Sequence, residues 1–158
     1  MAEIGFYHLK TTPLDRALPR LLERALGDGH RVVVMAGTEE RVAHLDQVLW
    51  TYDDASFLPH GAAGGGNAAR QPVWLTTEEE NPNGASMLVL VDGARATRLE
   101  GYRRICDMFD GNDVAAVVAA RERWRETKAA GHVLTYWEQT ANGWEKRSTT
   151  AGQGSTGG

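Results

Sequence analysis

The stretch of chain that follows residue 119 combines positive charge with a large aromatic ring. These side chains are spaced at i, i+3, i+4 and i+7: Arg121, Trp124, Arg125 and Lys128. An α-helix would place residues at this spacing on one face. Arginine and lysine form charge-assisted hydrogen bonds with carboxylates, and tryptophan offers apolar contact. The spacing therefore predicts a surface that binds an acidic, hydrophobic-tipped peptide of another protein.

The same helix allows two other interpretations. Val114, Val117 and Val118 would lie on the side of the cations, so these valines could belong to the core and the cations to a solvated helix end. Single-stranded nucleic acid is a competing ligand, because tryptophan stacks on bases and arginine contacts phosphates. One tryptophan and a few cations on a chain of net charge -4 offer little for binding a nucleic acid. An exposed or half-exposed Trp124 favours the peptide, since tryptophan and arginine often dominate interfaces.

Length and composition predict one globular domain. The chain has 158 residues, of which 42% are hydrophobic and 24% charged. Its single cysteine, Cys106, excludes an internal disulfide and fits a reducing cytoplasm, and we expect this thiol to be buried and inert. The N-terminus lacks a signal-peptide pattern, and no apolar run approaches the ~20 residues of a membrane span. We expect a cytoplasmic protein without a membrane anchor.

Alternating strands and helices must position the predicted surface. Buried or half-buried strands are expected at residues 3–8, 30–37, 72–77, 86–93, 101–109 and 132–140. Helices are expected from Pro13–Leu14 or from nearer Pro19, from Thr38 to about Trp50, and over residues 113–130, the last capped by Asn112 or Asp113. This order predicts a three-layer α/β/α domain around a mostly parallel, mixed sheet over residues 1–147. The polar residues 148–158 are expected to be disordered.

Signals of catalysis are weak. The glycine-rich residues 61–66 lack the lysine and the G-x-G-x-x-G spacing of a phosphate loop, so they predict a flexible surface loop. Asp53–Asp54 and the acidic run of Asp107, Asp110 and Asp113 could ligate a hard cation, but they lack calcium-loop spacing. The five histidines are scattered: His8, His30, His44, His60 and His132. We therefore expect no metal, no cofactor and no catalytic residue. A small nucleotide-binding or hydrolytic α/β enzyme is the alternative.

Several segments together resemble a known family. They are "FYHL", "ALPRLLERAL", "LDQVLWTYDDASFLPHG", "QPVWLTT", "AARERW" and "AGHVLTYW", and they cover most of residues 3–147 in order. The chain resembles the chi subunit of the bacterial DNA polymerase III holoenzyme, an accessory protein of the clamp loader. The resemblance implies a protein without catalytic activity, with a Rossmann-like fold that lacks a nucleotide site. It also implies a protein that links the replisome to single-stranded DNA-binding protein and reaches single-stranded DNA only indirectly.

The resemblance implies two partner surfaces. In the family, a helix with an Arg-x-Arg-aromatic-basic motif receives the acidic, phenylalanine-ended C-terminal tail of single-stranded DNA-binding protein. Transferred to this chain, the pattern falls on Arg121, Trp124 and Arg125, with Lys128 as a helper and Val117 as a wall. A second surface faces the psi subunit or another clamp-loader component through an "SF-x-PH" loop. Its implied contact residues are Phe57, Pro59 and His60, although Phe57 could equally be a core residue.

Overall fold

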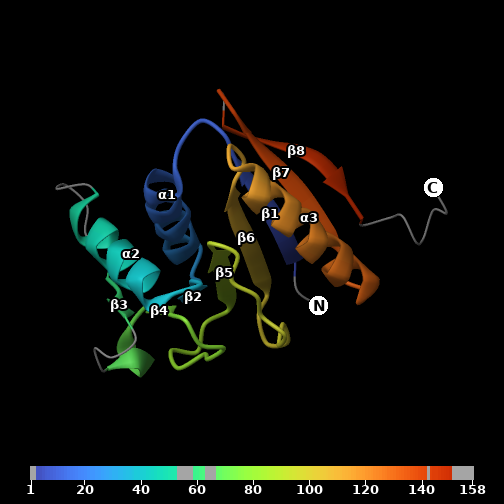
Figure 1. The fold of residues 1–158 in the computed structure, drawn as a ribbon. Helices are drawn as coiled ribbons and strands as arrows, with labels where there is room; N and C mark the ends of the chain where they lie inside the picture. The colour runs from blue at the N-terminus through green and yellow to red at the C-terminus, as the bar shows by residue number, and fades with distance from the viewer. Residues whose placement is uncertain (1–2, 53–58, 63–66, 142, 151–158) are drawn as a thin grey trace.

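The computed structural model describes residues 3–52, 59–62, 67–141 and 143–150 (Figure 1). Strands and helices alternate along most of the chain. Their order is β1 (Glu3–Leu9), α1 (Leu14–Gly27), β2 (Val32–Met35), α2 (Glu39–Thr51), β3 (Gly61–Ala62), the 3-10 helix η1 (Ala68–Arg70), β4 (Val73–Thr76), β5 (Met87–Val91), β6 (Arg104–Asp110), α3 (Val114–Ala129), β7 (Leu134–Thr140) and β8 (Gly143–Thr149). None of the described helices is long and apolar enough to cross a membrane.

The strands form one mixed sheet in the order β3-β4-β2-β5-β6-β1-β7-β8. Every neighbouring pair is parallel except β7 and β8, which pair antiparallel. The central strands β2 and β5 are buried along their whole length. Burial on both faces explains why their sequences are continuous apolar runs. The prediction of a mostly parallel, mixed sheet is confirmed.

Helices cover both faces of the sheet. Helices α1 and α2 pack through Leu18, Leu22 and Leu45 on one face, in a core that includes Val32 and Val34. The opposite face holds a second core, in which Ala120 of α3 is buried with residues of β1, β2 and β5. Figure 1 shows α3 lying across the ribbons of β1 and β7. The predicted three-layer α/β/α arrangement is therefore confirmed.

The helix starts follow local chemistry. Helix α1 begins at Leu14 directly after Pro13, and Pro19 lies buried inside the helix, so the earlier of the two expected starts is correct. Thr38 caps α2 by accepting a hydrogen bond from the amide of Arg41. Asp113 caps α3 by accepting hydrogen bonds from the amides of Ala115 and Ala116. The two caps set the first residues of α2 and α3.

The C-terminal edge differs from the prediction. Strand β8 was not expected, and Ser148 and Thr149 belong to it although a disordered tail was placed from residue 148 onward. The Thr150 amide donates to the Leu134 carbonyl, and the Leu134 amide donates to the Thr150 hydroxyl at 2.7 Å. The domain boundary predicted at residue 147 was therefore too early. Residues 151–158 lie outside the described part of the chain.

The cysteine lies where the sequence predicted. Cys106 is fully buried in β6. Burial raises the pKa of its thiol to about 11, so the thiol stays protonated near neutral pH.

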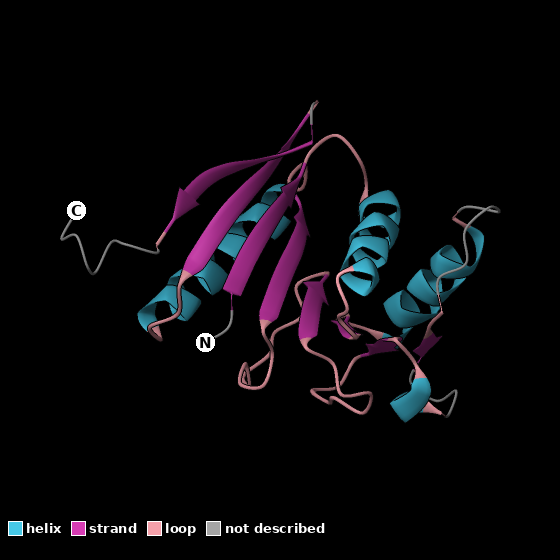
Figure 2. Ribbon diagram, turned by 180° about the vertical axis from the view of Figure 1, so that it is seen from behind, coloured by secondary structure: helices cyan, strands magenta, loops and turns pink. Residues whose placement is uncertain are grey.

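The helices that the structure describes leave one part of the sheet uncovered. On the α1 side, α1 packs against β2 and β6, while β1, β7 and β8 lie beyond it. Figure 2 shows these strands from that side, with α3 behind them and no described helix in front.

Candidate functional site

A strip of apolar and cationic side chains runs along the outside of α3. We call it the α3 strip, and its members are Val114, Val117, Val118, Arg121, Trp124, Arg125 and Lys128. Its three cations are exposed. Val114 and Val118 are 79% and 50% exposed, and only Val117 packs partly against the core. The interpretation that the three valines form core is therefore wrong for two of them.

Trp124 is half-buried at the inner edge of the strip. Its ring meets Phe6 of β1 at a centroid distance of 5.3 Å and Tyr136 of β7 at 5.8 Å, both edge-on. Edge-on aromatic contacts of this kind hold an indole in one orientation. Phe6 and Tyr136 thus hold the ring on its sheet side. On the helix the ring lies next to the exposed side chains of Arg121 and Arg125.

Two residues that the sequence analysis did not assign to the site extend this surface. His8 and Tyr136 are joined by a hydrogen bond between the His8 Nδ1 atom and the Tyr136 hydroxyl. Burial lowers the pKa of His8 and raises the pKa of Tyr136, and the positive charge of Arg121 acts on both groups. The signal for Tyr136 was the period-two alternation of the 132–140 strand, which puts it on the same face as the buried Leu134.

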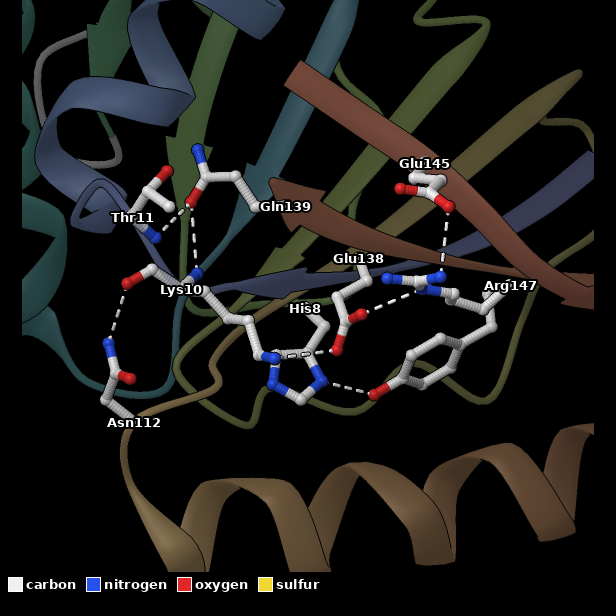
Figure 3. A network of polar contacts seen from close by, with 9 residues as sticks. His8, Lys10, Thr11, Asn112, Glu138, Gln139, Glu145 and Arg147 are labelled. Atoms are coloured by element: carbon white, nitrogen blue, oxygen red, sulfur yellow. Dashed lines mark hydrogen bonds and ion pairs between the residues drawn. The ribbon is translucent and has the colours of Figure 1, made fainter. Parts of the chain in front are cut away.

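A polar network borders the surface on the β7–β8 side (Figure 3). Glu138 accepts from Lys10 at 2.9 Å and from Arg147 at 2.8 Å, and Arg147 also reaches Glu145 at 3.0 Å. The hydrogen bond from Lys10, followed by that from Arg147, lowers the pKa of Glu138. The charge of Glu138 is therefore balanced by two cations. Glu126 on α3 itself is paired with Arg95.

The residues of the second predicted surface are only partly described. Phe57 lies outside the described residues, and Pro59 is half-buried. The His60 side chain is buried, with Nε2 2.9 Å from Asp46 Oδ1 and its ring 4.8 Å from that of Trp50. His60 therefore joins its loop to α2. The neighbouring Trp50, which the sequence analysis did not single out, is 55% exposed.

Those carboxylates considered as cation ligands that the structure describes have structural partners. Asp107 accepts two hydrogen bonds from the buried Arg123, at 2.7 and 2.9 Å. Asp110 accepts from the Asn112 amide, and Asp113 caps α3. Asp53 and Asp54 lie outside the described residues. Within the described residues no group of three histidine, cysteine or acidic side chains is arranged to hold a metal ion.

Comparison with known proteins gives a consistent result. A family model described as DNA polymerase III chi subunit, HolC, matches residues 1–135, which include the α3 strip and the 57–60 loop. The probable DNA polymerase III subunit chi of Rickettsia prowazekii is 30% identical over 108 residues, which cover 66% of this chain and 66% of that protein. The match therefore spans just under two thirds of that relative.

Two further relatives carry the same description. The DNA polymerase III subunit chi of Pseudomonas aeruginosa is 25% identical over 137 residues, covering 85% of this chain and 94% of the relative. The subunit chi of Escherichia coli is 26% identical over 107 residues, covering 67% of this chain and 72% of the relative. Because the family model matches most of the chain, the chain belongs to the DNA polymerase III chi subunit family.

Proposed function

We propose that this protein is a non-catalytic replication adaptor. It links the clamp loader of DNA polymerase III to single-stranded DNA-binding protein by holding that protein's acidic C-terminal tail on the α3 strip. The observation that carries the proposal is the half-buried Trp124, fixed by Phe6 and Tyr136 and flanked by exposed cations. Membership of the chi family supports the replication role.

The two ends of the tail meet different chemistry on the strip. A terminal phenylalanine ring packs against Trp124 and Val117, which are both partly buried. Its carboxylate and the preceding acidic side chains lie over Arg121, Arg125 and Lys128. Charge-assisted hydrogen bonds contribute about 1.5–3 kcal/mol each to the free energy of binding, before the entropy lost on ordering the peptide is subtracted. A small site of this kind binds at about the micromolar level, or roughly -8 kcal/mol.

The clamp-loader side of the adaptor is assigned to the loop at the end of α2. Phe57 and Pro59 are its implied contacts. His60 acts differently in this proposal, because its side chain is buried against Asp46 and it positions the loop. The exposed ring of Trp50 lies beside it and adds apolar area for the psi subunit or another clamp-loader component.

The test is calorimetric titration with a short peptide that copies the C-terminal tail of the host's single-stranded DNA-binding protein. We expect saturable binding that weakens as salt is added, because the cations are exposed. Removal of the terminal phenylalanine and the substitution Arg125→Glu should each weaken binding by about tenfold or more.

Arg20→Glu on α1 is the matched control. It makes the same change of charge on an exposed helical arginine, but α1 packs on the opposite face of the sheet. We expect this variant to bind the peptide like the wild type. Circular dichroism of both variants checks that the fold is retained. Equal peptide affinity of Arg125→Glu and the wild type would contradict the proposal.

A further inference from the structure

A groove of about 300 Å³ opens on the face of the sheet opposite the α3 strip. It lies between α1 and the β7–β8 hairpin, in the region that Figure 2 shows free of described helices. The buried Tyr7, Met87 and Met108 form its floor. Leu21 of α1 lines one side, and Trp144 of β8 lines the other. Neither the family resemblance nor the adaptor proposal gives this groove a role.

A row of cations follows the α1 side of the groove. Arg16, Arg20 and Arg24 are exposed and line it at intervals of four residues, which is about 6 Å along a helix. Within the described residues, the side chains of these three arginines form no ion pair or hydrogen bond. Arg104 adds a fourth guanidinium at the floor, where it donates to the Tyr7 hydroxyl at 2.7 Å. The row is therefore available to a ligand with repeated negative charge.

The acidic residues near the row are few, and two of them face α2. Asp15 is engaged by His44 at 2.6 Å, and Glu23 accepts a hydrogen bond from the Tyr52 hydroxyl. Asp28 is the one carboxylate among the residues that line the groove. Four arginines against one aspartate give the lining of the groove a positive charge. Asp15 and Glu23 lie with Arg16 and Arg20 in a neighbouring hollow between α1 and α2.

Aromatic rings face the cations across the groove. Trp144 is half-buried, and Tyr7 meets its ring edge-on at 5.2 Å and 86°. Trp137 on the neighbouring strand stacks beside Tyr7 at 6.2 Å, and the Lys146 ammonium lies 5.7 Å from the centre of its ring. The groove thus joins a line of guanidinium groups to one indole, that of Trp144, while Trp137 supports Tyr7 from the neighbouring strand.

We propose that this groove binds single-stranded nucleic acid. Regularly spaced arginines match the repeated phosphates of one strand, and an indole offers a flat face on which a base stacks. An acidic peptide without aromatic residues would satisfy the arginines but would leave the ring of Trp144 without a stacking partner. The site goes beyond the adaptor proposal and is independent of it, because α3 and α1 lie on opposite faces of the sheet.

Fluorescence anisotropy of the full chain with labelled oligo(dT) of about 12 nucleotides tests the proposal. We expect saturable binding that falls steeply between about 50 and about 200 mM salt. Arg20→Glu should weaken it about tenfold, and Trp144→Leu about fivefold, since the first reverses a phosphate contact and the second removes stacking. Arg125→Glu makes the same charge change on the other face and should leave the affinity unchanged.

Three results would overturn the assignment. The first is no binding at low salt. The second is equal weakening by Arg20→Glu and Arg125→Glu, which would show that only overall charge matters. The third is competition by poly-glutamate as effective as that by unlabelled oligo(dT), which would identify an acidic protein segment as the ligand. Because Arg20→Glu retains binding of the tail peptide in the adaptor proposal, failure of one proposal is distinguishable from failure of the other.

Discussion

At the scale of single residues, the buried ion pair between Arg123 and Asp107 is the contact whose loss should cost the fold most. Both side chains are buried, and two hydrogen bonds of 2.7 and 2.9 Å join them between α3 and β6. Burial raises the pKa of Asp107, while the hydrogen bonds from Arg123 favour its charged form. Each partner is therefore tolerated inside the protein because the other is present.

Removal of one partner should destabilise the fold strongly. We expect Arg123→Met to lower the free energy of unfolding by about 3–5 kcal/mol, since it leaves a buried carboxylate without its cation. Urea denaturation measures the loss. The double variant Arg123→Met/Asp107→Leu should recover most of it, because both polar groups are then replaced by apolar ones. Equal stability of Arg123→Met and the wild type would contradict this account.

His8 should make stability depend on pH. Burial lowers its pKa in the folded state from the ordinary value of 6.5. The unfolded chain therefore binds a proton first as the pH falls, and the stability due to neutral His8 is present above 6.5 and is lost below it, down to the lower folded pKa. Urea denaturation at about pH 7.5 and about pH 5.5 should show a smaller decrease for His8→Gln than for the wild type.

The other four histidines are common to both proteins, so the difference between the two pH dependences reports on His8. Identical slopes would show that His8 has the same pKa in the folded and unfolded states.

At the scale of elements, the turn between β6 and α3 requires a glycine. The Gly111 amide donates to the Leu9 carbonyl at 2.7 Å, and a Cβ atom at this position would lie 2.4 Å from that oxygen and 1.9 Å from the His8 ring. We expect Gly111→Ala to lower the free energy of unfolding by about 1–3 kcal/mol, as overpacking does. Thermal or urea denaturation measures it.

Gly27→Ala is the matched control for this turn. Gly27 ends α1, and a Cβ atom there would meet nothing within 4 Å. This variant should be neutral or stabilising by about 0.4–1 kcal/mol, because alanine restricts the unfolded chain. Similar destabilisation by both substitutions would show that crowding at Gly111 is not the cause.

The sequence indicates some elements far better than others. Strands β2 and β5 were predictable because burial on both faces demands an unbroken apolar run. Strand β8 was missed because it is an edge strand whose middle is Glu145, Lys146 and Arg147, and edge strands are commonly charged. Apolar character alone also misled at Val114 and Val118, which are exposed on α3.

In the candidate site, too, the sequence predicts local spacing but not contacts between distant segments. Helical periodicity is local, so the spacing of Arg121, Trp124 and Arg125 was enough to place them along one helix. Tyr136 meets Trp124 only because β7 lies beside β1 under α3, and this contact depends on the tertiary fold. The contact of His60 with Asp46 likewise depends on how the chain returns to α2, which no local pattern encodes.

At the scale of the whole molecule, the sheet separates the two proposed binding surfaces. The α3 strip lies on one face and the arginine-lined groove on the other. We expect saturating tail peptide to leave the affinity for oligo(dT) unchanged, since ligands at separate sites on a rigid sheet have little coupling free energy. Anisotropy titrations with and without peptide measure this. Full displacement of the oligonucleotide would mean that both ligands share one site.

The central claim is that the tail of single-stranded DNA-binding protein binds next to Trp124. The chain has five tryptophans, and each gives one indole N–H signal in a nitrogen–proton NMR spectrum: Trp50, Trp74, Trp124, Trp137 and Trp144. Substitution of single tryptophans by phenylalanine assigns these signals. On titration with the tail peptide, the Trp124 signal should shift most, while those of Trp50 and Trp144 stay in place. A shift of Trp50 or Trp144 with Trp124 unmoved would contradict the account.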